Sequence, residues 1–169
     1  MELKYCPQCG GALAAVEIDG FQRMACPDPE CGYTFWFNPT PVVAGLVEYE
    51  GDVLLIQNKD WPPGWWGLLT GFLEKDETPG QGMLRELREE LGLEGEIAGL
   101  IGLYSFFRMN QIIAAFHVRA WGPITVGDEL NGYKAVPIDK LRPWKGATGK
   151  ATADWLAARR GEKGLGNWE

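Results

Sequence analysis

The sequence predicts a mixed α/β fold, in which helices enclose a sheet and a small cysteine-rich module comes first. Two observations indicate this class. All four cysteines fall within the first 31 of 169 residues. The rest of the chain alternates hairpin signals with helical patterns irregularly, which favours a mixed sheet over a doubly wound parallel one. With 46% hydrophobic residues, the chain has enough apolar side chains for a core.

The cysteines form two close pairs separated by a hairpin-like segment. They are Cys6, Cys9, Cys26 and Cys31. This spacing is typical of a zinc ribbon, in which four thiolates hold one structural Zn²⁺. Two disulfides are the alternative, which a cytosolic chain disfavours. We therefore predict a zinc ribbon at residues 1–37, followed by one larger domain at 38–165.

A hairpin is predicted at the start of the larger domain, with strands at 42–49 and 53–57. Residues 38–41 are interpreted as a linker, because their two prolines favour extended backbone and lack the N–H that a central strand uses. A short strand at 67–73 then leads toward the first helix.

That helix is predicted at residues 79–91. Thr78 can cap its free N–H groups, Gln81 occupies the capping-box position, and Pro79 suits the first helical residue. Leucines recur on one side at helical spacing and form an apolar stripe. Gly92 supplies a C-terminal stop.

A second hairpin is predicted within residues 96–121, and residues 122–132 are expected to form a loop. The last helix is expected to end near Arg160, with Thr148 or Thr152 as its N-cap.

Three carboxylates share one face of the first helix. They are Glu86, Glu89 and Glu90. Like charges at this spacing destabilise a helix by roughly 0.2–0.5 kcal/mol per pair, a penalty that a bound Mg²⁺ would reverse. A solvated face with an ordinary Arg85–Glu89 ion pair is the alternative. Gly71 and Glu77, at fixed distances upstream, favour the metal site.

Residues 71–93 fill every fixed position of the pattern G-x5-E-x7-R-E-U-x-E-E-x-G-U, where U is aliphatic. This pattern resembles the signature of the Nudix hydrolases, which cleave nucleoside diphosphates linked to another moiety. The resemblance covers about residues 42–142. It implies an α/β/α sandwich with a mixed sheet and a metal-dependent pyrophosphohydrolase that acts on acid anhydrides.

By the same resemblance, the backbone carbonyl of Gly71 and the three helix glutamates would hold Mg²⁺ or Mn²⁺. Arg85 would orient the carboxylates of the loop and helix. Some family members use a glutamate of the signature as the base, and others use an acid on a distal loop. The candidate catalytic residues are therefore Glu90, Glu86, Arg85 and Glu129, with a plain polar turn as the alternative for Glu129.

A cysteine ribbon ahead of this domain resembles the NADH pyrophosphatases and the related FAD or ADP-ribose pyrophosphatases. The array that marks the NADH-specific group is absent here. We expect cleavage of the pyrophosphate bond of a nucleoside diphosphate derivative, such as FAD, ADP-ribose or an NADH-like dinucleotide. The candidate substrate-binding residues are Glu74, Phe37, Tyr104 and Phe106. A core role is the alternative for each aromatic residue, and binding of an additional metal or capping of the loop is the alternative for Glu74.

A non-catalytic nucleotide sensor on the same fold is the alternative function, which the intact glutamates disfavour. The net charge of −7 argues against binding to nucleic acid or membrane surfaces, and so against an RNA-cap enzyme. No apolar run resembles a signal peptide or a membrane span. We expect a cytoplasmic protein with a small nucleotide-derived substrate, and a homodimer by resemblance. His117, in an apolar strand, is expected to be a core or interface residue.

Overall fold

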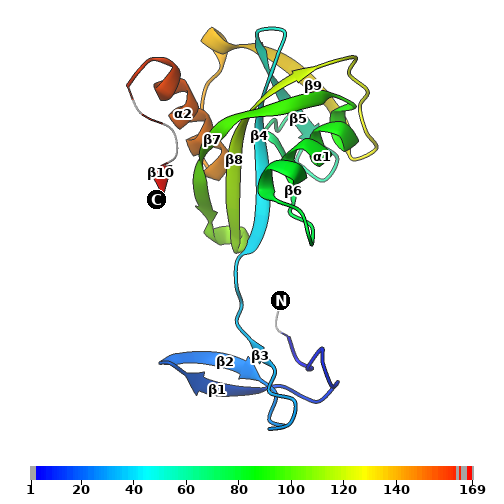
Figure 1. The fold of residues 1–169 in the computed structure, drawn as a ribbon, viewed down its shortest axis with the longest axis vertical. Helices are drawn as coiled ribbons and strands as arrows, with labels where there is room; N and C mark the ends of the chain where they lie inside the picture. The colour runs from blue at the N-terminus through cyan, green and yellow to red at the C-terminus, as the bar shows by residue number, and fades with distance from the viewer. Residues whose placement is uncertain (1–2, 163, 165–166, 169) are drawn as a thin grey trace. The chain divides into compact units, whose positions relative to one another are not determined.

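The computed structural model describes residues 3–162, 164 and 167–168 (Figure 1). The chain divides into two compact units, Met1–Asn38 and Pro39–Glu169. In the described part of the chain, no helix is long and apolar enough to cross a membrane.

The first unit is a small antiparallel sheet. Its strands are β1 (Ala14–Ile18), β2 (Phe21–Ala25) and β3 (Thr34–Phe35), in that order across the sheet. Among the described residues of this unit, only Cys6 and Ala25 are buried. So little apolar burial cannot stabilise a module of this size without a further constraint.

The second unit contains a seven-stranded sheet in the order β10-β7-β8-β4-β5-β9, with β6 paired to β4. The strands are β4 (Thr40–Tyr49), β5 (Asp52–Asn58), β6 (Leu69–Phe72), β7 (Glu94–Phe106), β8 (Gln111–Trp121), β9 (Leu130–Pro137) and β10 (Asn167–Trp168). Two pairs, β4–β8 and β7–β10, are parallel and the others are antiparallel. The predicted mixed sheet is confirmed.

Two helices pack against this sheet, α1 (Pro79–Leu91) and α2 (Ala147–Arg159). Alternate residues of β4 point to opposite faces. Ala44 and Leu46 belong to a core cluster that includes Trp155 of α2, whereas Val43 and Val47 belong to a second cluster that includes the leucines of α1. The helices therefore cover opposite faces, and the predicted α/β/α sandwich is confirmed.

The first helix begins and ends where its capping signals predict. Thr78 and Gln81 form both hydrogen bonds of the capping box, Pro79 is the first helical residue, and Gly92 ends the helix with a φ of 66°. This agreement reflects signals that lie within the helix or next to it.

The predicted linker was wrong at its end, because β4 begins at Thr40 and includes Pro41. Thr40 N–H donates to the carbonyl of Asn110 at 2.8 Å, and the carbonyl of Pro41 accepts from Leu73 N–H at 3.3 Å. A proline this close to the start of a strand removes one donor without preventing pairing on either side.

The predicted caps of the last helix were also wrong. The N-cap is Gly146, without a side-chain hydrogen bond, and both threonines lie inside α2. Thr152 Oγ1 donates to the carbonyl of Thr148 at 2.9 Å. The carbonyl of Trp144 packs against Gly149 in the first turn of the helix, where any Cβ would overlap it. The loop at 122–132 is shorter than predicted, since β9 begins at Leu130.

Candidate active site

The loop between β6 and α1 brings a strand backbone against a helix side chain. Gly71 lies on β6 opposite Val43 of β4. A Cβ added at Gly71 would overlap the carboxyl group of Glu86, so no other residue fits without displacing that carboxylate. The glycine of the sequence pattern therefore has a steric explanation, namely the close approach of Glu86 to the strand.

Arg85 connects the loop to the helix through a network of charge-assisted hydrogen bonds. Its guanidinium donates to both carboxylate oxygens of Glu77, at 3.1 and 2.8 Å. It also donates to Glu86 at 2.8 Å, to Glu89 at 2.9 Å and to the carbonyl of Phe72 at 3.0 Å. With so many partners, the arginine restricts the positions of three carboxylates.

Glu77 is the carboxylate that closes the loop. It accepts from the N–H of Glu74 at 2.7 Å in addition to its pair with Arg85. Hydrogen bonding from Arg85, and secondarily from the Glu74 backbone, lowers the pKa of Glu77. Glu77 is therefore ionised and hydrogen-bonded to Arg85 and to the Glu74 backbone. The Glu74 side chain is exposed to solvent.

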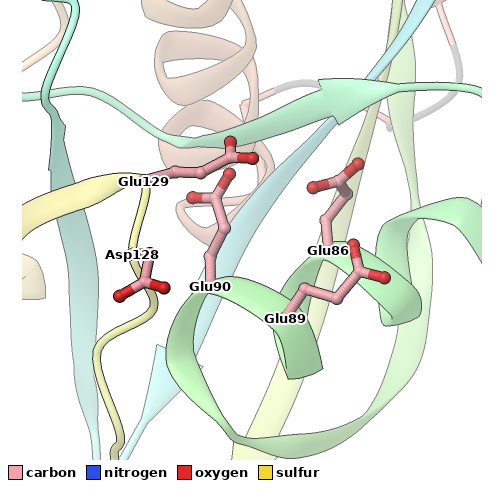
Figure 2. A pocket seen from close by; sticks show the side chains of 5 residues that line it. All are labelled: Glu86, Glu89, Glu90, Asp128 and Glu129. Atoms are coloured by element: carbon pink, nitrogen blue, oxygen red, sulfur yellow. The ribbon is translucent and has the colours of Figure 1, made fainter.

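Five carboxylates line a cavity of about 230 Å³ between α1 and the loop that precedes β9 (Figure 2). They are Glu86, Glu89 and Glu90 from the helix and Asp128 and Glu129 from the loop. The structure thus brings the helix glutamates and Glu129 to one cavity, and their catalytic roles stay predictions.

Glu90 is the most deeply placed acid of this cavity. Its residue is 4% exposed, and its Oε2 atom is buried without a hydrogen-bond partner among the described groups. Burial, followed by the charges of Glu86 and Glu129, raises the pKa of Glu90 to about 8. Burial also raises the pKa of Glu86.

This donor set fits a divalent cation. A buried carboxylate oxygen without a partner is costly, and repulsion between neighbouring carboxylates adds to that cost. Mg²⁺ and Mn²⁺ prefer oxygen ligands and leave room for water and phosphate. The helix acids that line this cavity are Glu86, Glu89 and Glu90, and the part of the Gly71 carbonyl as a further ligand stays a prediction.

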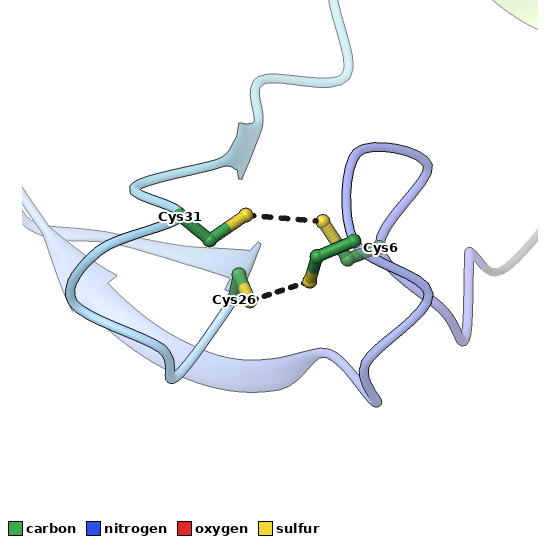
Figure 3. A group of neighbouring side chains, drawn as sticks. Cys6, Cys26 and Cys31 are labelled. Carbon is green, nitrogen blue, oxygen red and sulfur yellow. Dashed lines mark hydrogen bonds between the residues drawn. The ribbon is translucent and has the colours of Figure 1, made fainter.

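The four cysteines of the first unit also lie together. Their Sγ atoms are within 4.8 Å of one another, with Cys6–Cys31 and Cys9–Cys26 each at 3.6 Å (Figure 3). Tetrahedral zinc at about 2.3 Å from each sulfur requires sulfur–sulfur distances of roughly 3.8 Å. The thiols are free, because the sulfur–sulfur distances are much longer than the disulfide bond length of about 2.05 Å. The set therefore fits Zn²⁺.

The aromatic candidates for substrate binding are placed separately. Tyr104 is buried and its hydroxyl donates to Asp154 at 2.8 Å. Phe106 is partly buried against the core cluster on the α2 side. Phe37 lies in the first unit, exposed and edge-on to Phe35. Their stacking roles stay predictions.

Two further residues of the second unit, His117 and Gly127, make close contacts with a helix. His117 lies against Trp155, and its Nε2 is 2.8 Å from a carboxylate oxygen of Glu48, in keeping with a core residue. Gly127, which the sequence reasoning missed, packs against the last turn of α1. No local signal marks it, because a glycine before two acids reads as an ordinary turn.

Comparison with known proteins shows relatives with related chemistry. The chain is 28% identical over 142 residues to the NAD-capped RNA hydrolase NudC of Pseudomonas aeruginosa, covering 83% of this chain and 50% of the relative. It is 36% identical over 74 residues to an ADP-ribose pyrophosphatase of Methanocaldococcus jannaschii, covering 43% and 44%. The chain thus spans about half the length of the NudC relative.

A solved structure extends the likeness to both units. The crystal structure of a Nudix hydrolase from Nitrosomonas europaea superposes with a TM-score of 0.82 at 26% identity, covering 98% of this chain and 97% of that one. The family model of the NUDIX domain matches residues 38–156. The chain therefore belongs to the NUDIX domain family.

Proposed function

We propose that this protein is a metal-dependent pyrophosphohydrolase that cleaves a nucleoside diphosphate derivative. The observation that carries the proposal is the cavity of five carboxylates, in which the Oε2 atom of Glu90 is buried without a partner. Membership of the NUDIX domain family and relatives named as pyrophosphate-cleaving enzymes support the same reaction class.

In this proposal, the carbonyl of Gly71 and the carboxylates of Glu86, Glu89 and Glu90 hold Mg²⁺ or Mn²⁺. The bound ion would neutralise charge on the phosphates and activate a water. Arg85 is a positioning residue, since its hydrogen bonds fix Glu86 and Glu89 relative to the loop.

The proton of the attacking water needs an acceptor within hydrogen-bond reach. Glu90 is our first candidate because it lines the cavity and is its most buried acid. Glu129 is the second, because it lines the same cavity from the loop that precedes β9. Both are therefore candidate catalytic residues, together with Glu86.

The substrate class follows from the chemistry that the relatives share. One is named for NAD-capped RNA and another for ADP-ribose, which supports a nucleoside diphosphate joined to a further group. FAD, ADP-ribose and NADH-like dinucleotides are the members we propose. Glu74, Phe37, Tyr104 and Phe106 remain the proposed substrate contacts.

We also propose that residues 1–37 form a ribbon held by structural Zn²⁺ and that residues 38–165 form the hydrolase domain. The clustered cysteines and the two compact units support this division. A cytoplasmic location and a homodimer stay predictions.

The proposal is tested by measuring phosphate release, after phosphatase coupling, from a substrate panel with Mg²⁺ or Mn²⁺. The panel contains FAD, NADH, ADP-ribose, diadenosine polyphosphates, nucleoside triphosphates and an NAD-capped oligoribonucleotide. We expect one metal-dependent substrate among the dinucleotides or ADP-ribose. No turnover across the panel, from folded and zinc-loaded protein, would contradict the proposal and favour a nucleotide sensor.

A further inference from the structure

The loop between β8 and β9, residues 122–129, is attached to the C-terminal end of α1. Thr125 N–H donates to the carbonyl of Leu91 at 2.8 Å, and Gly127 N–H donates to the carbonyl of Glu90 at 2.8 Å. Carbonyls in the last turn of a helix have no partner within the helix. The loop satisfies two of them and so follows the position of the helix end.

Gly127 makes this attachment sterically possible. A Cβ at this position would lie 2.5 Å from the carbonyl oxygen of Glu89 and 3.2 Å from Glu90 Cα. Gly127 is not among the glycines with a positive φ, so the close approach alone excludes a side chain. Any larger residue must separate the loop from the helix.

Docking of the loop on α1 restricts the position of Glu129, two residues after Gly127. Asp128 and Glu129 both line the cavity, and the backbone of Glu129 is held on its other side by a hydrogen bond from Lys59 N–H to its carbonyl at 2.9 Å. Leu130, the next residue, is buried at the start of β9. Figure 2 shows the carboxylate of Glu129 beside that of Glu90.

We infer that Gly127 is a positioning residue, whose lack of a side chain docks the loop on α1 and places Glu129 beside Glu90 before any ligand binds. This inference rests on the proposed function, because it assigns Glu129 a part in the reaction. It predicts that Asp128 and Glu129 already line the cavity in the free protein, and that substrate binding is not needed to bring them there.

A double-mutant cycle tests the inference with the substrate found in the panel. Glu129→Gln should lower kcat by about 100-fold or more, and Gly127→Ala should lower it by roughly 10- to 100-fold with KM nearly unchanged. If Gly127 acts through Glu129, the double variant should match Glu129→Gln alone within about two-fold. Losses that multiply would overturn the inference.

Val126→Ala is the matched control, because Val126 is the neighbouring residue and is 40% exposed. It should leave kcat within about two-fold of the wild type. Thr125→Pro provides an independent way to detach the loop, since it removes the N–H that donates to Leu91. It should repeat the effect of Gly127→Ala, and the same cycle can be measured with it if the alanine variant does not fold.

Amide hydrogen exchange supplies a readout that does not depend on turnover. The N–H groups of Thr125 and Gly127 should be protected in the wild type without metal or substrate. In Gly127→Ala, protection of Thr125 should fall while the amides of α1 stay protected. Rapid exchange at both positions in the wild type would overturn the inference.

The outcomes separate this inference from the proposed function. Full kcat in Glu129→Gln, alongside an active wild type, would remove the role of Glu129 and leave the pyrophosphohydrolase assignment intact. An inactive wild type with protected loop amides would instead contradict the proposed function, because the docking itself would stand.

Discussion

The two candidate metal sites of this protein differ in ligand chemistry and in openness. In the first unit, four thiols lie within 4.8 Å of one another and can fill a tetrahedral shell. In the second, five carboxylates surround a cavity of about 230 Å³. A filled shell of sulfur ligands stabilises a fold, whereas oxygen ligands around an open volume leave positions for water and phosphate.

The two units also differ in how much apolar surface they bury. Only Cys6 and Ala25 are buried among the described residues of the first unit. The second unit has apolar clusters on both faces of its sheet. With the proposed zinc, the first unit would depend on its metal for stability. The second unit can keep its fold while it holds unfavourable charges in its cavity.

The largest expected effect is the loss of the zinc site. Cys6→Ser should unfold the first unit, because structural zinc contributes an apparent binding free energy of about 10–16 kcal/mol at neutral pH. The second unit should keep its own dispersed NMR spectrum. Zinc content and two-dimensional spectra of the full chain measure both, and one zinc per chain in the variant would contradict the ribbon.

Removing one carboxylate should have the opposite outcome. Glu90→Gln should lower kcat by about 100- to 1,000-fold through weaker charge stabilisation, with an unchanged fold by circular dichroism. Glu96→Gln is the matched control, since its side chain is 60% exposed on β7. Wild-type turnover in Glu90→Gln would exclude this residue from the metal site.

The cost of holding charge in the cavity should appear in the stability of the metal-free protein. Burial raises the pKa of Glu90 from 4.5 to about 8, so the folded state retains a proton that the unfolded state releases. This contribution to stability is complete below about pH 4.5 and is lost as the pH rises to about 8. The difference between the free energies of unfolding of Glu90→Gln and the wild type should therefore increase in favour of the variant. The increase should be up to about 1.4 kcal/mol per pH unit in that window.

Chemical denaturation of both proteins at several pH values, in the presence of a chelator, measures this difference in the free energy of unfolding. Added Mg²⁺ should stabilise the wild type and narrow the difference between the two proteins, because the ion binds the folded state of the wild type more tightly. A difference that does not change with pH would show that Glu90 is ionised in the folded protein throughout.

The smallest expected effect concerns the cap of α1. Thr78 Oγ1 accepts from Gln81 N–H, and Gln81 Oε1 accepts from Thr78 N–H at 2.8 Å. Thr78→Ala should lower the free energy of unfolding of the second unit by about 1 kcal/mol. Lys75→Ala, at a side chain that is 90% exposed, should change it by less than about 0.5 kcal/mol. Equal effects of the two variants would show that the box does not stabilise the helix.

Features that depend on short-range signals were predictable. Helix α1 has its cap, its first proline and its terminal glycine within a few residues of its ends. The cysteine pairs and the spacing of the helix glutamates are equally local, so each indicated its chemistry before any packing was known. Where a local signal was ambiguous, as for the threonines of α2, the prediction was wrong.

The sequence by itself determined the fold class and the ends of α1, and it indicated the candidate ligands of both proposed metal sites. Only the tertiary structure decided that Gly71 must be glycine because Glu86 occupies its Cβ space, and that Gly127 brings Glu129 to Glu90. The tertiary structure also buried Tyr104 against α2, where its hydroxyl donates a hydrogen bond to Asp154. The physical reason is common to these cases: contacts between distant segments depend on how the sheet and helices pack, and no short sequence window contains that packing.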